Sequence, residues 1–369
     1  MRFVLVALLV VGCGDNSARP DAGGGGSADA HVFEDAGIDA PNPNNPATLF
    51  ATGLCIDHAC MQISPDVHEY TPQFPLWADT ATKRRWIYLP PGTQIDTTDM
   101  DHWDFPVGTK LWKEFTRDGV RIETRLVMRI GPGTTAQDWF YASYQWNLAA
   151  TDTTLAPPLT GVQNANGTMH DIPSRAMCKG CHENFQPTRI LGFGAIQLDW
   201  PGVNADDLTL AKLVTDGTLT TNPPAVAPGT PYYPIEGSAE VRAGIGYVHA
   251  NCSHCHNPNS QVHDLVPMEL RLLVGEVHDH TLTAAYRTAV GHRASQPVGL
   301  MASQYHCPDM NNMPNAAECI IAPGIPADSA LIHRFEATPN TSLHMPALGS
   351  EMTDPSGDTT LTTWITSPN

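Results

Sequence analysis

Residues 139–146 read Trp-Phe-Tyr-Ala-Ser-Tyr-Gln-Trp, and this aromatic run identifies the first half of the chain as β-structure. Aromatic side chains are enriched in strands because they pack well on a pleated surface. Upstream, residues 120–130 alternate between apolar and polar side chains, and turn signals at 118–119 and 132–133 bound the segment. Alternation with a period of two between turns is typical of half-buried strands. We therefore expect two antiparallel strands here.

Further strands are expected on the N-terminal side of this pair. Residues 86–89 (Trp-Ile-Tyr-Leu) precede a Pro-Pro-Gly turn, and residues 110–115 (Lys-Leu-Trp-Lys-Glu-Phe) precede the turn at 118–119. Short strands with turns at this spacing suggest an antiparallel, β-sandwich-like domain, which we place at residues 49–168. Its aromatic side chains are expected to form a core rather than a surface that stacks on a ligand.

From about residue 170 the pattern changes to short helical stretches between Pro- and Gly-rich loops. Asn204 and Ser238 can each cap a helix, and residues 359–365 can form a last short helix. The expected fold class is α+β. The β-domain is followed by a mostly α-helical, loop-rich region at residues 169–369, with a second module at about 238–369.

Two five-residue motifs in this second region indicate its chemistry. Residues 178–182 read Cys-Lys-Gly-Cys-His and residues 252–256 read Cys-Ser-His-Cys-His, so both match the pattern of c-type haem attachment. Two thiols three positions apart reach the two vinyl groups of one porphyrin, and the adjacent His ligates the iron. We therefore expect two covalent haem c groups in a dihaem cytochrome c region. The attachment residues are Cys178, Cys181, Cys252 and Cys255, and the iron ligands are His182 and His256.

Other readings of these cysteines explain less. Seventy residues lie between Cys181 and Cys252, whereas paired zinc ribbons space their cysteine pairs about 15–20 residues apart. Zinc also leaves the two histidines unexplained, and a thioredoxin-like motif would need a βαβ setting. The glycines at 192 and 194 lack the preceding strand of a dinucleotide site.

Each iron needs a second axial ligand or an open site. Residues 342–349 place a Met-Pro step in a loop before the last expected helix, which is the usual arrangement of class I cytochromes c. We therefore pair Met345 with His256, a ligand set that raises the reduction potential. Met310, Met313 and His344 are the alternatives.

The first haem does not follow this arrangement, because no Met occurs between His182 and Met268. His170 is our first choice for its second ligand, since it lies in a lead-in segment that Pro173 stiffens. The alternatives are Met169, Met177, His249 and His254.

Nine cysteines occur in the chain, and four of them lie outside the motifs and outside the N-terminal segment. They form two close pairs in the sequence. Of the three possible connectivities, disulfides Cys55–Cys60 and Cys307–Cys319 are expected.

The N-terminus resembles an export signal. Residues 1–12 combine Arg2 with an apolar run too short to span a bilayer. The run ends in Val-Val-Gly-Cys, which matches a bacterial lipobox, so lipidation is expected at Cys13. Residues 13–48 then form a flexible linker. Gly14 is not the Asp of an inner-membrane retention signal, so we expect a periplasm-facing, lipid-anchored protein with the outer membrane favoured.

The chain is acidic, with 38 Asp and Glu residues against 20 Lys and Arg residues and a formal net charge of −18. This composition argues against nucleic-acid binding. It suits a positively charged redox partner.

Several motifs together resemble an uncharacterised family of bacterial dihaem c-type cytochromes with an N-terminal β-domain. They include Tyr-Thr-Pro-Gln-Phe-Pro-Leu-Trp-Ala-Asp at 70–79, Lys-Arg-Arg-Trp-Ile-Tyr-Leu-Pro-Pro-Gly at 83–92 and Tyr-Val-His-Ala-Asn at 247–251. The resemblance covers about residues 65–366. It implies a β-domain followed by a dihaem region, and it implies no particular substrate.

The expected function is electron transfer by a lipoprotein that faces the periplasm. The alternative is a haem-dependent oxidoreductase, with either an open first haem or a substrate site at the interface with the β-domain. The electron carrier is favoured, and no catalytic residue is assigned.

Overall fold

The computed structural model describes residues 44–300, 307 and 318–367. The signal segment, Cys13, most of the linker, Met310 and Met313 lie outside these residues. Among the described residues, no helix combines the length and the apolar character needed to cross a membrane.

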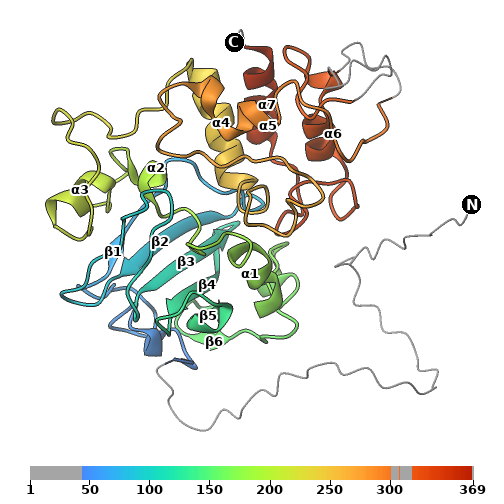
Figure 1. Cartoon of the computed structure of the whole chain (residues 1–369). Helices are drawn as coiled ribbons and strands as arrows, with labels where there is room; N and C mark the ends of the chain where they lie inside the picture. The colour runs from blue at the N-terminus through green and yellow to red at the C-terminus, as the bar shows by residue number, and fades with distance from the viewer. Residues whose placement is uncertain (1–43, 301–306, 308–317, 368–369) are drawn as a thin grey trace, which may run out of the picture.

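The first half of the described chain forms one six-stranded antiparallel sheet whose strands follow one another in sequence order (Figure 1). Period-two alternation and tight turns produce this meander. The strands are β1 (His68–Glu69), β2 (Thr82–Tyr88), β3 (Lys110–Arg117), β4 (Val120–Arg129), β5 (Trp139–Trp146) and β6 (Thr153–Leu155).

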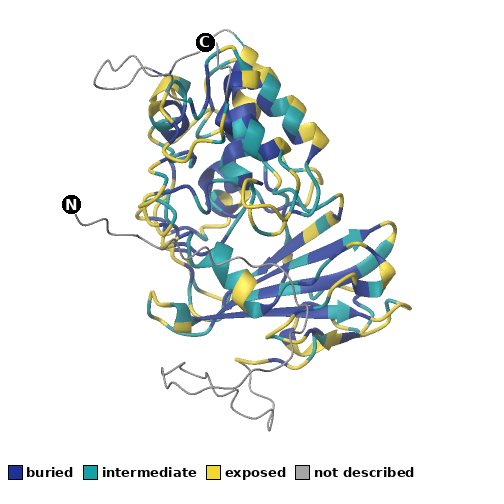
Figure 2. Cartoon of the chain, turned by 90° about the vertical axis from the view of Figure 1, so that its right-hand side faces the viewer, coloured by how far each residue is buried: buried dark blue, intermediate teal, exposed yellow. Residues whose placement is uncertain are grey.

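The expected β-sandwich is wrong, because the described strands form a single sheet. Residues 49–67, which include a short 3-10 helix at Phe50–Thr52, pack on one face with Trp86 and Trp112. Residues 190–219 cover part of the other face, beside Ile87 and Tyr141. Alternation of apolar and polar residues in the sequence shows which face of a strand is buried, but it does not show which segment covers that face. The aromatic side chains are buried in these two layers, as predicted, and Figure 2 shows the strands largely in the colour of buried residues.

Seven α-helices occur in the described part of the chain, and the longest has 13 residues. Ser238 caps the longest one as predicted, whereas Thr209 rather than Asn204 caps the helix that starts at Leu210. The helices are α1 (Arg175–His182), α2 (Ala195–Leu198), α3 (Leu210–Thr215), α4 (Ala239–Asn251), α5 (Ala284–Thr288), α6 (Ala330–Glu336) and α7 (Pro355–Thr366). Further 3-10 turns lie at Ala136–Asp138, Ala165–Gly167, His280–Leu282 and Pro326–Asp328.

The expectation of a mostly α-helical region after the β-domain is therefore also wrong. Helical residues account for 23% of the described chain, and turns and irregular loops connect the short helices. Pro201, Gly217 and Gly291 follow α2, α3 and α5 within three residues and prevent their extension, because Pro removes a backbone donor and Gly favours non-helical conformations.

The helices α4 and α7 form the centre of the second half and lie side by side in Figure 1. Gly244 lets the two helices approach closely, since an added Cβ there would lie 2.3 Å from Trp364 Cγ. Trp364 in turn donates a hydrogen bond from Nε1 to the Tyr286 hydroxyl at 3.1 Å. This packing provides a rigid support for the segment that follows α4.

Both predicted disulfides are present. Cys55 is bonded to Cys60 in the segment that covers the sheet, and Cys307 is bonded to Cys319. The four cysteines of the two Cys-x-x-Cys-His motifs are free.

Candidate functional site

The first motif lies on α1, which packs against β5 (Figure 1). The Ser174 hydroxyl caps the helix by accepting a hydrogen bond from the Met177 amide at 3.3 Å. Arg175 fixes the helix to the sheet, because its Nε donates to the Tyr141 carbonyl at 3.1 Å. Cys178 and Cys181 are therefore held on one turn of a helix whose last residue is His182.

The geometry of His182 suits an iron ligand. Its Nδ1 lies 2.6 Å from the Arg189 carbonyl oxygen. A carbonyl can only accept, so Nδ1 carries the proton and Nε2 keeps its lone pair. Burial lowers the pKa of His182 to about 4, which keeps the imidazole neutral. Hydrogen bonds of this kind orient ligating histidines.

The second motif forms a tight turn at the end of α4. The amides of Cys255 and His256 both donate to the Cys252 carbonyl, at 3.1 and 2.9 Å. His256 is buried, and its Nδ1 has no hydrogen-bond partner among the described residues. Burial lowers the pKa of His256 to about 4. A buried, neutral imidazole is the form of His that can ligate iron through Nε2.

The four thiols lack the usual setting for redox exchange. Burial raises the pKa of Cys178 to about 11, the pKa values of Cys252 and Cys255 to about 12, and also the pKa of Cys181. Such thiols stay protonated at neutral pH, whereas disulfide exchange needs thiolates.

The two motifs lie next to each other, although 70 residues separate them in the sequence. The side-chain amide of Asn257 donates to the Asn184 carbonyl at 3.2 Å, and that of Asn259 donates to the Gln186 carbonyl at 3.1 Å. The segments that follow the two motifs are thus joined directly.

Met345 lies in a loop that runs close to both motifs. Its amide donates to the Arg334 carbonyl at 3.0 Å, and Arg334 is the charged neighbour that contributes to the lowered pKa of His256. Three residues later, Leu348 reaches α1, where its Cδ1 would lie 3.2 Å from a Cβ added at Gly180. The pairing of Met345 with His256 stays a prediction.

The alternative His344 is less available. Its Nδ1 lies 2.9 Å from the Ala337 carbonyl oxygen, and its Nε2 lies 3.3 Å from the Ser350 hydroxyl. Both ring nitrogens are therefore engaged within the loop. The other two alternatives, Met310 and Met313, lie outside the described residues.

His170 is held in a buried contact with Glu123. Its Nε2 lies 2.7 Å from Glu123 Oε1, and both side chains are almost completely buried. Ligation of iron through Nε2 would require this contact to break, so the assignment stays a prediction that the geometry does not favour. Neither Met169 nor Met177 is buried.

His249 and His254 lie close to the motifs. The Leu272 amide donates to His249 Nδ1 at 3.0 Å, so the proton of this neutral ring is on Nε2. A protonated Nε2 cannot ligate iron. His254 is buried, and burial lowers its pKa to about 4, so it remains a candidate ligand for the first haem.

The expectation of a metal-binding cytochrome c needs correction in two respects. No group of three or more His, Cys, Asp or Glu side chains in the described part of the chain is arranged to hold a metal ion. The region around the motifs also lacks the helical content of a cytochrome c fold. A haem iron differs from a side-chain-bound ion, because the porphyrin supplies four of its ligands and the protein at most two.

Basic residues on the sheet face near the motifs were missed at the level of sequence. Arg85 and Lys113 line a cavity together with Phe185, His249, Ser253 and His254. The signal lay in the basic residues at alternate positions of β2, but only the strand register shows that Arg85 lies opposite Lys113.

Comparisons of this chain with known protein families, with curated proteins and with solved structures gave no match. The functional proposal below depends on the residues and their geometry.

Proposed function

We propose that the chain binds two haem c groups covalently, one at each Cys-x-x-Cys-His motif, and transfers electrons. The observation that supports this most is the direct joining of the two motifs through Asn257 and Asn259. When bound, each haem would supply a one-electron centre. Side-by-side attachment places two such centres close together, and electron tunnelling becomes faster as the distance shortens.

The protein's own residues would prepare these sites in three ways. The paired cysteines would form thioether bonds, and the neutral imidazoles of His182 and His256 would each ligate one iron. Burial excludes water and keeps those imidazoles unprotonated. Met345 is proposed as the second ligand opposite His256.

Haem attachment is tested on protein from a host that has the haem-maturation machinery. The denatured wild type is expected to keep two haems by intact mass. Cys181→Ala and Cys255→Ala are each expected to lower the content sharply at one site, while Cys55→Ala, outside the motifs, keeps both haems. Wild-type protein that contains no covalent haem, with or without zinc, would contradict the proposal.

An oxidoreductase with an open first haem is the second candidate. It is favoured by the hydrogen bonds that engage His170 and His249, which leave fewer histidines to close the first site. Carbon monoxide binding to the reduced wild type, retained in Cys255→Ala and lost in Cys181→Ala, would support this function. A reduced protein that binds no carbon monoxide supports the electron carrier.

The location is also part of the proposal. Lipidation at Cys13 would tether the protein to a membrane that faces the periplasm, with the outer membrane favoured, where it would meet a positively charged redox partner. Cys13→Ser is expected to abolish lipid labelling, and release of unlipidated wild type would contradict the anchor.

A further inference from the structure

One face of the sheet carries a row of basic side chains. Arg85 of β2 lies opposite Lys113 of β3, and Lys113 lies opposite Arg125 of β4. Since side chains alternate along a strand, all three lie on the same face. Tyr141 of β5 shares that face, and its ring packs 5.4 Å from the ring of His182. The row therefore faces the first motif.

Only one of these three side chains has a carboxylate partner within the described chain. Arg125 forms an ion pair with Glu123, whose Oε1 lies 2.9 Å from Arg125 Nε. Among the ion pairs between described residues, none includes Arg85 or Lys113. Burial lowers the pKa of Lys113 well below its usual value, and the charges of Arg85, Lys83 and Arg125 add to this effect.

The cavity beside these two cations has no carboxylate in its lining. Arg85 is 5% exposed, and its guanidinium forms no hydrogen bond or ion pair with another described residue. The chain has nearly twice as many acidic as basic residues, so a buried arginine and a partly buried lysine that line one cavity without an acid are unexpected. Buried charges are normally paired, because an isolated one costs several kcal/mol of desolvation.

We infer that Arg85 and Lys113 bind the two propionate carboxylates of the haem that is attached at Cys178 and Cys181. The charges match, since one carboxylate would pair with the Arg85 guanidinium and the other would raise the pKa of Lys113 and pair with its ammonium group. The second motif also lines this cavity, through Ser253 and His254. Tyr141, on the same face as both basic side chains, packs against the ring of His182, and this contact assigns the carboxylates to the first haem. This inference rests on the proposed function, and it makes the sheet part of the haem site.

The test uses the holoprotein and two variants, Arg85→Gln and Lys113→Gln. A nearby cation disfavours the ferric state, so its removal lowers the reduction potential of the first haem. We expect each variant to change the one-electron equilibrium about tenfold, which is about 59 mV. The first haem is recognised as the one whose signal is lost in Cys181→Ala. The matched control is Arg84→Gln, because Arg84 is adjacent in sequence but lies on the opposite face, paired with Glu69.

A second measurement needs no variant. The propionate bending band in the resonance Raman spectrum of the wild type is expected at the position of strongly hydrogen-bonded carboxylates, and to move in D2O. A band typical of free propionates, unchanged in D2O, would overturn the inference even if the variants do not fold.

The remaining outcomes distinguish a failure of the propionate inference from a failure of the proposed haem-binding function. Two haems by mass, with potentials in Arg85→Gln and Lys113→Gln equal to those in Arg84→Gln, would overturn the inference and leave the proposed function intact. Absence of covalent haem would overturn both. A wild-type potential that changes with added acetate or phosphate at constant ionic strength, and loses this response in Arg85→Gln, would assign the cations to a soluble anion and overturn the inference.

Discussion

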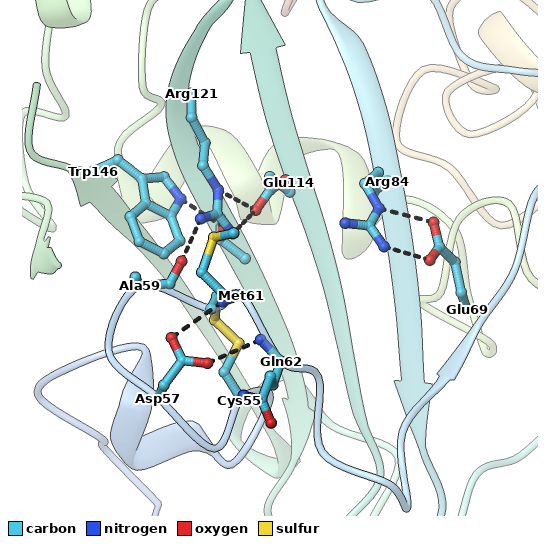
Figure 3. Close-up of polar contacts among 12 residues, drawn as sticks. Cys55, Asp57, Ala59, Met61, Gln62, Glu69, Arg84, Glu114, Arg121 and Trp146 are labelled. Atoms are coloured by element: carbon cyan, nitrogen blue, oxygen red, sulfur yellow. Dashed lines mark hydrogen bonds and ion pairs between the residues drawn. A yellow bond between two sulfur atoms is a disulfide. The ribbon is translucent and has the colours of Figure 1, made fainter. Parts of the chain in front are cut away.

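The two faces of the sheet treat charge in opposite ways. On the face shown in Figure 3, each labelled arginine has a carboxylate partner. Arg84 donates two parallel hydrogen bonds to Glu69, at 3.0 and 2.7 Å, and Arg121 donates from Nε to Glu114 at 2.6 Å. On the opposite face, Arg85 and Lys113 share no such partner. The first face, which we call the complete face, pairs its labelled arginines with carboxylates of the chain itself. The second, the incomplete face, is built to receive an anionic group.

A disulfide-bonded loop also covers the complete face. The Cys55–Cys60 disulfide holds a loop over it, and the Ala59 carbonyl in that loop accepts a hydrogen bond from Arg121 Nη1 at 2.7 Å (Figure 3). Arg121 also lies 3.5 Å from the centre of the Trp146 ring. Structural roles therefore account for these residues without a ligand.

The largest loss of stability is expected at Glu123, the one acidic residue that pairs with the basic row on the incomplete face. Glu123→Gln leaves the partly exposed Arg125 and the buried His170 without their carboxylate, and loss of one partner of a buried ion pair costs about 3–5 kcal/mol. Chemical unfolding should show a loss of that size. The matched change Glu69→Gln, at a more exposed pair, is expected to cost at most about 1 kcal/mol.

The same carboxylate also predicts a pH dependence. Burial acts to raise the pKa of Glu123, but Arg125 and His170 outweigh it, and the net result is a lowered pKa. Its stabilisation is thus present above the ordinary pKa of Glu and is lost as pH falls through the lowered value. Glu123→Gln should remove this part of the acid-induced loss of stability. An equal acid response in both proteins would show that Glu123 is not ionised in the fold.

The next effect concerns the complete face. Arg121→Ala removes the cation over Trp146 and leaves the buried Glu114 without its partner. We expect a loss of about 2–3 kcal/mol in the free energy of unfolding. Haem content and reduction potentials should stay those of the wild type, because the Arg121 side chain contacts Glu114, Ala59 and Trp146 rather than the motifs. A changed potential would break the distinction between the faces.

Removal of the Cys55–Cys60 disulfide is expected to have a smaller effect. The bond closes a short loop, with a sequence separation of 5, and short loops gain less chain-entropy stabilisation. The double change Cys55→Ser with Cys60→Ser should lower the unfolding free energy by about 2 kcal/mol. Unchanged stability under both oxidising and reducing conditions would contradict a structural role for this loop.

The smallest effect is expected at Lys83, next to the incomplete face. Burial lowers its pKa to about 7, with Arg85 and Arg125 adding to the shift. Between pH 7 and the ordinary pKa of Lys, the unfolded state binds more protons, so stability should rise with pH in this window. Lys83→Met should flatten this rise in haem-free protein, whereas Lys212→Met, at an exposed ion pair with Asp216 on α3, should keep it. A flat wild-type profile would contradict the lowered pKa.

The sequence predicts strands and attachment motifs well, because both are local patterns. The strand at 139–146 and the turn of helix at 178–182 depend on neighbours a few residues apart. A single sheet instead of a sandwich could not be predicted, since alternation does not say which segment covers each face. The helical content was overestimated. Apolar periodicity marks short helices clearly, but the length of the irregular loops between them cannot be read from the sequence, because these loops have the composition of ordinary linkers.

Partners distant in sequence account for the rest. The sequence gives no sign that Glu123 binds His170, so His170 looked available to a haem. The opposition of Arg85 and Lys113 depends on the register of two strands, and the link from Asn257 to Asn184 depends on the packing of α4. These tertiary contacts decide the site, and no local pattern contains them.

The side-by-side arrangement of the two motifs is tested most directly by low-temperature EPR of the fully oxidised holoprotein. Two adjacent ferric haems should give signals broadened by their magnetic interaction, and the remaining haem in Cys255→Ala should give a sharper, isolated signal. A wild-type spectrum equal to the sum of the spectra of Cys181→Ala and Cys255→Ala would mean that the two haems do not interact, and would contradict electron transfer between neighbouring sites.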